Sequence, residues 1–196
     1  SFEIKHIPLL EKISKTNKPV IISTGIADMS DIELALDIFK NNKVSLLKCT
    51  SEYPALIEEA NLNNIAFLKN TFNVDVGLSD HTLGKECALA AVAIGASIIE
   101  KHFILDRKKG GLDAEFSMEP SEFKDMVQSI RKIESALGQN EFKLSKGSLK
   151  SKNRGRKIYI SEDVKLDEIV NESNIRIVRG SDGIDPKNYY DVLGKK

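Results

Sequence analysis

The chain has 196 residues, of which 41% are hydrophobic and 30% are charged, so it is long enough to bury at least one hydrophobic core. Its 29 basic and 29 acidic residues cancel, and we therefore expect neither nucleic acid nor a membrane among its partners. No apolar stretch approaches the roughly 20 residues of a membrane span and no signal peptide opens the chain, which favours a soluble, cytoplasmic protein.

Strand and helix patterns alternate over the first 138 residues, after a start at Ser1 to Ile4 that resembles the tail of an earlier strand. Short apolar or β-branched runs predict strands at residues 20–24, 44–50, 74–78 and 97–103. Helices are predicted from a capping box at Ser30, from Asn61, over 87–94, and from Ser121 to Gly138. This order predicts parallel strands joined by helical crossovers.

Polar side chains close every predicted strand. The groups are Glu3, Ser23, Ser51 with Tyr53, Ser79 with His81, and Glu100 with His102. A (β/α)8 barrel carries its active site at the C-terminal ends of all its strands, whereas a doubly wound sheet binds ligands at one switch point. We therefore predict an α/β fold that is the second half of a (β/α)8 TIM barrel, with the doubly wound sheet as the alternative.

Two of the three histidines, His81 and His102, follow consecutive predicted strands. Neighbouring strands lie about 4.8 Å apart, so both imidazoles can reach one metal ion at roughly 2.1 Å. A lone histidine at a strand end is more often structural, but this matched pair favours a catalytic metal site. Asp80, Glu100 and Lys101 are expected to orient the two rings.

Beyond Gly138 the composition changes. Residues 139–153 are rich in Lys, Asn and Ser and predict an exposed linker. The sequence thus divides into a barrel portion at residues 1–138, the linker, and a second portion at residues 154–196. The two cysteines, Cys49 and Cys87, have neither metal-ligand nor disulfide spacing and are expected to be buried thiols.

Several motifs resemble, in order and spacing, the sialic acid synthase family. They are Ser23-Thr24-Gly25, Lys48 to Pro54, Gly77 to Gly84, Gly95-Ala96, Glu100 to Phe103 and Phe116 to Pro120. Ser51 and the segment Gly110 to Ser117 are similar to the pseudaminic acid synthases of that family. Residues 156–164 and 174–183 resemble part of its antifreeze-like (SAF) domain, although Gly180-Ser181 replaces the usual Pro-Gly after Arg179.

The resemblance implies that phosphoenolpyruvate condenses with an acylamino sugar aldehyde to give a nine-carbon 2-keto sugar acid and phosphate. It implies Mn²⁺ or Mg²⁺ on His81 and His102, and a homodimer in which the SAF domain reaches the partner's barrel. The implied catalytic residues are His81, His102 and Glu3. Ser1, Ser23, Ser51 and Ser79 match phosphoenolpyruvate contacts, and Glu3, Tyr53, Asp113 and Arg179 match sugar contacts.

Alternatives remain for both the residues and the function. The serines could cap strands, Tyr53 could be a packing residue, and Asp113 could form a turn. The function could be that of an N-acetylneuraminate or legionaminic acid synthase, or of a non-catalytic sugar-binding module derived from a truncated synthase. Since the family's early strands, with a catalytic glutamate and lysines, have no match here, we expect a fragment that is inactive alone.

Overall fold

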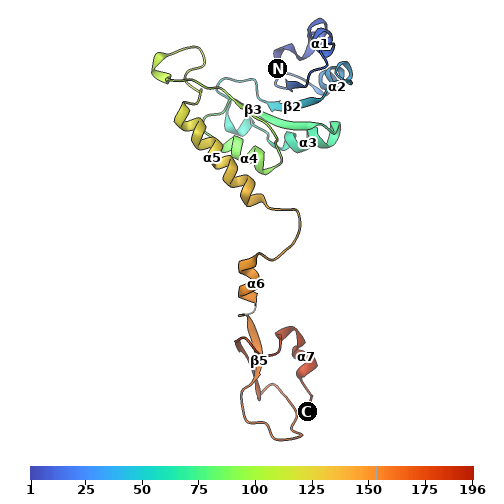
Figure 1. The fold of residues 1–196 in the computed structure, drawn as a ribbon, viewed down its shortest axis with the longest axis vertical. Helices are drawn as coiled ribbons and strands as arrows, with labels where there is room; N and C mark the ends of the chain where they lie inside the picture. Colours follow the sequence, from blue (N-terminus) through green and yellow to red (C-terminus); the bar gives the residue numbers. More distant parts are fainter. Residues whose placement is uncertain (153) are drawn as a thin grey trace. The chain divides into compact units, whose positions relative to one another are not determined.

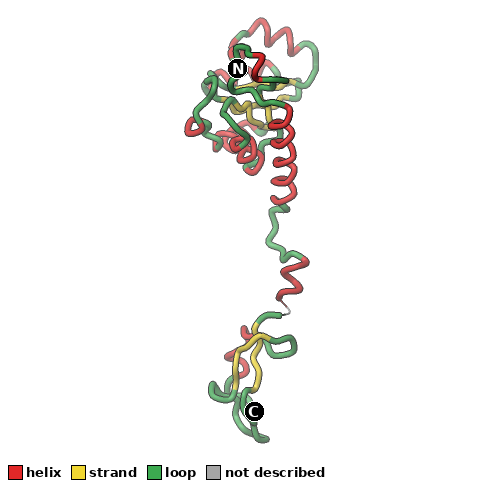
Figure 2. Tube along the Cα trace, turned by 90° about the vertical axis from the view of Figure 1, so that its left-hand side faces the viewer, coloured by secondary structure: helices red, strands yellow, loops and turns green. Residues whose placement is uncertain are grey.

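A computed structural model describes residues 1–152 and 154–196, which fall into two compact units, Ser1–Gly138 and Gln139–Lys196 (Figure 1). Within the described residues, no helix is both long and apolar enough to cross a membrane. In Figure 2 the strands form two groups, a four-stranded sheet in the first unit and a two-stranded sheet in the second.

The sheet of the first unit is parallel, and its strands follow one another in chain order, β1-β2-β3-β4. They are β1 (Val20–Ser23), β2 (Val44–Cys49), β3 (Asp75–Asp80) and β4 (Ile99–Lys101). A doubly wound sheet reverses its strand order partway, so that alternative is wrong. Consecutive parallel strands with a helix after each are the arrangement of a barrel wall, and the sheet curls into a half-barrel.

Helices connect and cover the strands of this half-barrel. They are α1 (Ile7–Ser14), α2 (Met29–Ile38), α3 (Asn63–Phe72), α4 (Glu86–Ala93) and α5 (Pro120–Leu137), with short 3₁₀ turns at Ile57–Glu59 and Arg107–Lys109. Ala88 and Ala91 of α4 are fully buried. Because the Ala88 side chain is small, α5 can pack closely and bury Met126 and Ile130 beside α4, whereas Ala91 belongs to the core cluster that contains Val76 of β3.

Two local predictions were wrong. Ser1 to Ile4 is not a strand tail, because Phe2–Lys5 forms a 3₁₀ turn closed by a hydrogen bond from His6 N–H to Glu3 O at 2.9 Å. A strand tail needs a partner strand for its backbone groups, whereas this turn satisfies its own and leads directly into α1. Helix α2 is capped by Asp28 rather than Ser30, because Asp28 and Asp31 exchange side-chain and backbone hydrogen bonds.

The second unit contains one antiparallel pair, β5 (Arg156–Ile160) and β6 (Ile175–Arg179), followed by a 3₁₀ turn at Pro186–Asn188 and α7 (Tyr189–Val192). Ile158 and Ile175 are its buried apolar residues. Asn174 is also buried, and its side chain closes the preceding loop through Asn171 N–H and Ile169 O.

The predicted linker is exposed, but it is not wholly irregular. A short helix, α6 (Lys146–Lys152), lies in it, and Ser145 Oγ accepts a hydrogen bond from Ser148 N–H at its start. The predicted end of the linker at Asn153 lies outside the described residues.

Gly180 follows β6 at the position where Pro-Gly begins in the resembling domains. Its N–H donates to Gly155 O at 3.3 Å, a bond that a proline cannot make. A Cβ on Gly180 would lie 1.8 Å from the Tyr159 hydroxyl oxygen. A proline at this position would lose that hydrogen bond and displace the Tyr159 ring.

Candidate active site

His81 and His102 meet at the C-terminal edge of the parallel sheet, as predicted. Strands β3 and β4 are hydrogen-bonded neighbours, with Ser79 opposite Glu100 and Asp80 opposite Lys101. The two imidazole rings that follow these strands have centroids 5.2 Å apart and planes inclined by 65°. His81 is buried, and about a third of the His102 side chain is exposed.

The surroundings of His81 determine which ring nitrogen carries the proton. Its Nδ1 lies 2.8 Å from Thr50 O and 3.9 Å from Cys49 Sγ. A carbonyl oxygen can only accept a hydrogen bond, so Nδ1 donates and Nε2 keeps its lone pair. Burial acts to lower the pKa of His81, but the hydrogen bonds to Cys49 and Thr50 outweigh burial and raise that pKa above its ordinary value.

His102 is oriented in the same way by an acid. Its Nδ1 lies 3.4 Å from Asp113 Oδ2, and a carboxylate favours a proton on the nitrogen that faces it. Both histidines thus direct Nδ1 toward an acceptor and leave Nε2 available. The structure thus places Asp113 beside His102.

Two aromatic rings enclose the histidines. The Tyr53 ring lies 4.3 Å from His81 and 6.0 Å from His102, and the Phe116 ring lies 4.9 Å from His102. Burial raises the pKa of the Tyr53 phenol, which therefore stays protonated and able to donate at neutral pH. The sequence pattern predicts no separate role for Phe116, and the family-like motif that contains it was the available signal.

The predicted serines lie near this pair in two groups. Ser1 Oγ and Ser51 Oγ are 3.0 Å apart, and Ser51 Oγ lies 3.9 Å from Cys49 Sγ, which in turn neighbours His81. Ser79 Oγ donates to Glu100 Oε1 at 2.7 Å.

A cavity of about 220 Å³ lies between Glu100, the partner of Ser79, and the first residues of the chain. It is lined by Ser1, Glu3, Ser23 and Glu100 among others. The Glu3 carboxylate lies 3.2 Å from His6 Nδ1. The structure therefore brings Glu3 and Ser23 to a cavity beside Glu100, while no direct contact joins Glu3 to the histidine pair in the described residues.

Asp80 and Lys101 form a buried ion pair, with Lys101 Nζ 2.8 Å from Asp80 Oδ2 and each side chain 1% exposed. Lys101 Nζ also donates to Thr82 O, and Asp80 Oδ1 accepts from Thr82 N–H and Oγ1–H. Fully paired buried charges of this kind fix local geometry. Here they hold the residue that follows His81.

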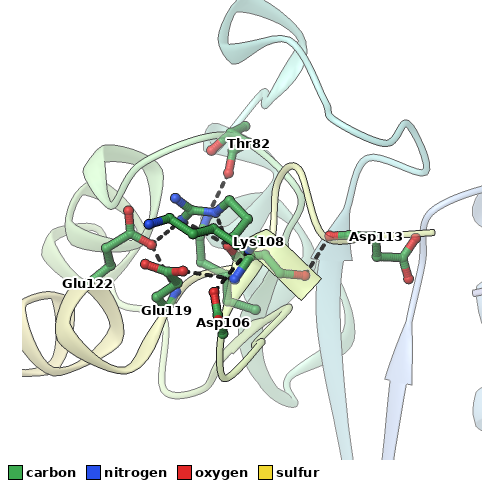
Figure 3. Close-up of polar contacts among 9 residues, drawn as sticks. Thr82, Asp106, Lys108, Asp113, Glu119 and Glu122 are labelled. Carbon is green, nitrogen blue, oxygen red and sulfur yellow. Dashed lines mark hydrogen bonds and ion pairs between the residues drawn. The ribbon is translucent and has the colours of Figure 1, made fainter. Parts of the chain in front are cut away.

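The loop between β4 and α5 carries Asp113 (Figure 3) and is anchored by Arg107. The Arg107 N–H donates to Glu119 Oε1 at 2.8 Å, and its guanidinium contacts Ser117 O and the Glu122 carboxylate. Ser117 Oγ donates in turn to Asp113 O at 2.6 Å. These contacts tie the loop to the first turn of α5 and so restrict the position of Asp113.

The donor set fits a weakly coordinated divalent ion. Centroids 5.2 Å apart allow both Nε2 atoms to reach one ion at about 2.1 Å. Within the described residues there is no group of three or more histidine, cysteine or carboxylate ligands. Two neutral imidazoles leave positions open for water and substrate oxygens, which differs from a closed structural zinc site.

A model of the NeuB family matches residues 1–142. The chain belongs to the NeuB family. The family resemblance seen in the motifs is therefore confirmed. The histidine pair and the four serines lie within the residues that the family model matches.

Relatives of known name extend this match. The chain is 45% identical over 199 residues to a pseudaminic acid synthase of Campylobacter jejuni, covering 100% of this chain and 58% of that protein. It is 44% identical over 201 residues to an N,N'-diacetyllegionaminic acid synthase of the same species, covering 100% and 60%. The chain thus spans less than two thirds of the length of these relatives.

A solved structure supports the fold. The N-acetylneuraminic acid synthetase of Leptospira borgpetersenii, determined with citrate, superposes with a TM-score of 0.72 at 39% identity. The match covers 76% of this chain and 53% of that protein. The fold described above is therefore shared with this solved synthetase structure.

Lys48 of β2 is linked to His81 through Thr50. It is 6% exposed and lines a cavity of about 450 Å³ with Ile32 of α2 and Leu68 of α3. Burial lowers its pKa. Lys48 Nζ donates to Thr50 Oγ1 at 2.6 Å, and the carbonyl of the same threonine accepts from His81 Nδ1. Lys48 thus fixes the residue that sets the His81 tautomer.

Replacing Lys48 by methionine is expected to weaken Mn²⁺ binding about tenfold, the lower end of effects seen for groups that orient metal ligands. The folded structure should stay at least as stable, because a buried ammonium is exchanged for an apolar side chain of similar length. Mn²⁺ titration by electron paramagnetic resonance measures the affinity. Lys43→Met, an exposed change just before the same strand, is the control. Unchanged affinity in a folded Lys48→Met protein would contradict the positioning role.

Proposed function

We propose that this chain forms part of the active site of a pseudaminic acid synthase. The reaction condenses phosphoenolpyruvate with 2,4-diacetamido-2,4,6-trideoxy-L-altrose and yields a nine-carbon 2-keto sugar acid and phosphate. The observation that carries the proposal is the His81 and His102 pair, with both Nδ1 atoms facing acceptors, beside Tyr53 and Asp113. The name of a 45% identical relative supports the choice of product.

Mn²⁺ or Mg²⁺ held by His81 and His102 would supply Lewis-acid polarisation of the sugar aldehyde. The chain's own residues position the reactants. Asp113 accepts hydrogen bonds from sugar hydroxyls, Tyr53 donates to a sugar oxygen, and Phe116 excludes water from one side of the histidines.

The serines bind the anionic reactant. Ser1 and Ser51 lie within hydrogen-bond distance of each other, so both hydroxyls can turn toward one phosphate or carboxylate group. In the reaction, C3 of phosphoenolpyruvate forms a bond to the aldehyde carbon, water adds at C2, and the C2–O bond to phosphate breaks. Hydroxyl donors fixed before the reaction stabilise the charge on the departing phosphate.

We further propose that residues 154–196 are part of an antifreeze-like SAF domain and that the protein acts as a homodimer. Arg179, at the end of β6, would contact the sugar bound in the partner's barrel. The support is the motif that contains Asn174 and Arg179, together with the short β5–β6 sheet that holds it.

Substrate preference tests the proposed product. The complete gene product, supplied with phosphoenolpyruvate and Mn²⁺, is expected to convert the diacetamido-trideoxy-L-altrose at least about 100-fold faster than N-acetylmannosamine, because several polar groups of the sugar must be matched at once. Mass spectrometry of side-by-side reactions identifies the products.

The 44% identical legionaminic acid synthase makes its sugar the competing candidate. A third reaction should therefore contain the acylamino sugar aldehyde that corresponds to N,N'-diacetyllegionaminic acid. Preference for this sugar, or for N-acetylmannosamine, would reject the pseudaminic assignment but keep the condensation. Absence of product with all three sugars would favour a non-catalytic sugar-binding module.

A further inference from the structure

Three arginines of the second unit surround one cavity. Arg154, Arg156 and Arg179 line a space of about 450 Å³ together with Ser151 and Gly155. All three arginine residues are exposed at its rim. The lining arginines therefore come from the end of β6, from the start of β5 and from the segment just before β5.

The arrangement places two like charges opposite each other in one sheet. Arg156 and Arg179 are directly opposite each other in the antiparallel β5–β6 pair. Like charges at opposed positions destabilise a sheet. The chain nevertheless fixes this pair, because Arg156 Nη1 donates to Ile177 O at 3.2 Å and Gly180 N–H donates to Gly155 O at 3.3 Å.

The repulsion is not relieved by acids within the described residues. Arginine ion pairs there involve Arg107 and Arg131, and none involves Arg154, Arg156 or Arg179. Residues 139–196 as a whole carry 13 basic and nine acidic side chains. An anion from outside the chain would provide the missing compensation.

We propose that Arg154, Arg156 and Arg179 form a binding site for a small phosphate- or carboxylate-bearing anion. Guanidinium groups bind such anions through paired, charge-assisted hydrogen bonds. The site shares Arg179 with the sugar contact proposed above, but it goes beyond the condensation because its ligand is an anion held with Arg154 and Arg156 and needs neither the sugar nor the metal. Phosphoenolpyruvate and inorganic phosphate are both sources of the required group in that reaction.

Arg176 provides a matched control within the same sheet. It lies opposite Tyr159, and because side chains alternate along a strand, it projects from the other face of β6 than Arg179 does. Arg176→Gln thus removes the same charge from the same sheet without changing the cavity.

The test follows the Nε–Hε signals of ¹⁵N-labelled arginine during titration with inorganic phosphate. The chain has only six arginines, so each can be assigned by substitution. Signals of Arg154, Arg156 and Arg179 are expected to shift together and saturate with a dissociation constant below about 1 mM. Those of Arg107, Arg131 and Arg176 should stay in place. Parallel titrations with phosphoenolpyruvate and pyruvate show whether phosphate or carboxylate binds more tightly.

Substitution completes the test. Arg156→Gln and, separately, Arg154→Gln should each weaken phosphate binding at least about tenfold, the loss of one charge-assisted contact, whereas Arg176→Gln should leave it unchanged. Equal shifts at Arg176, or shifts that do not saturate, would identify an adventitious ion only and overturn the proposal. Because activity is not measured, failure here is distinguishable from failure of the proposed condensation.

Discussion

His81→Ala is expected to abolish Mn²⁺ binding and to lower kcat of the complete gene product by at least about a thousandfold. The reason is that charge stabilisation by a metal ion lowers the activation barrier by several kcal/mol. The physical reason is local. Thr50 O holds the proton of His81 on Nδ1, so the Nε2 lone pair is free to bind a metal ion. Alanine at this position removes one of the two protein ligands proposed for the ion.

Mn²⁺ titration by electron paramagnetic resonance, alongside product formation, measures both effects. His6→Ala is the matched control for metal binding, because His6 is the third histidine of the chain and lies at the surface beside Glu3. Its Mn²⁺ affinity should equal that of the parent protein. Near-normal, cation-stimulated turnover by His81→Ala would show that this ring is not a ligand.

The strand pattern allowed much of this site to be predicted. Parallel strands joined by helices bring their C-terminal ends to one edge, so residues far apart in sequence, such as His81 and His102, converge without any further information. The same argument explains why Tyr53 also reaches the histidines: it follows β2, the strand that neighbours β3.

What the pattern missed depends on contacts outside the strand ends. The Lys48 to Thr50 bond crosses from one face of β2 to its end, and period-2 alternation describes faces rather than such links. Glu3 was expected at a strand end but lies in a 3₁₀ turn. Its backbone conformation is set by local hydrogen bonds, which four residues of sequence do not specify.

Phe116 shows a second limit. It lies in a long loop whose course depends on Arg107, and that anchoring rests on contacts to Ser117 and Glu122 rather than on any periodic pattern. Loops of this length are determined by specific side-chain contacts. The motif flagged the segment, but only the structure shows its ring against His102.

The proposed dimer predicts a complementation between two impaired chains. His102→Ala removes a metal ligand from its own barrel, and Arg179→Ala removes the sugar contact that would be donated to the partner. The arginine loss is expected to lower kcat/KM about 10- to 100-fold, as for a charge-assisted hydrogen bond. If Arg179 acts across the interface, a mixed dimer has one site with an intact barrel and an intact arginine.

Equal mixing of the two full-length variants, with unfolding and refolding or co-expression to exchange subunits, should give half mixed dimers. One working site in each then restores about a quarter of the parent activity. Mixing His81→Ala with His102→Ala is the matched control. Each chain of this mixed dimer carries a defective metal site in its own barrel, so neither barrel can work. Differently tagged subunits, purified in sequence, establish that mixed dimers are present. Recovery in the first mixture and none in the control is expected, whereas mixed dimers that stay inactive in both would place Arg179 outside the partner's site.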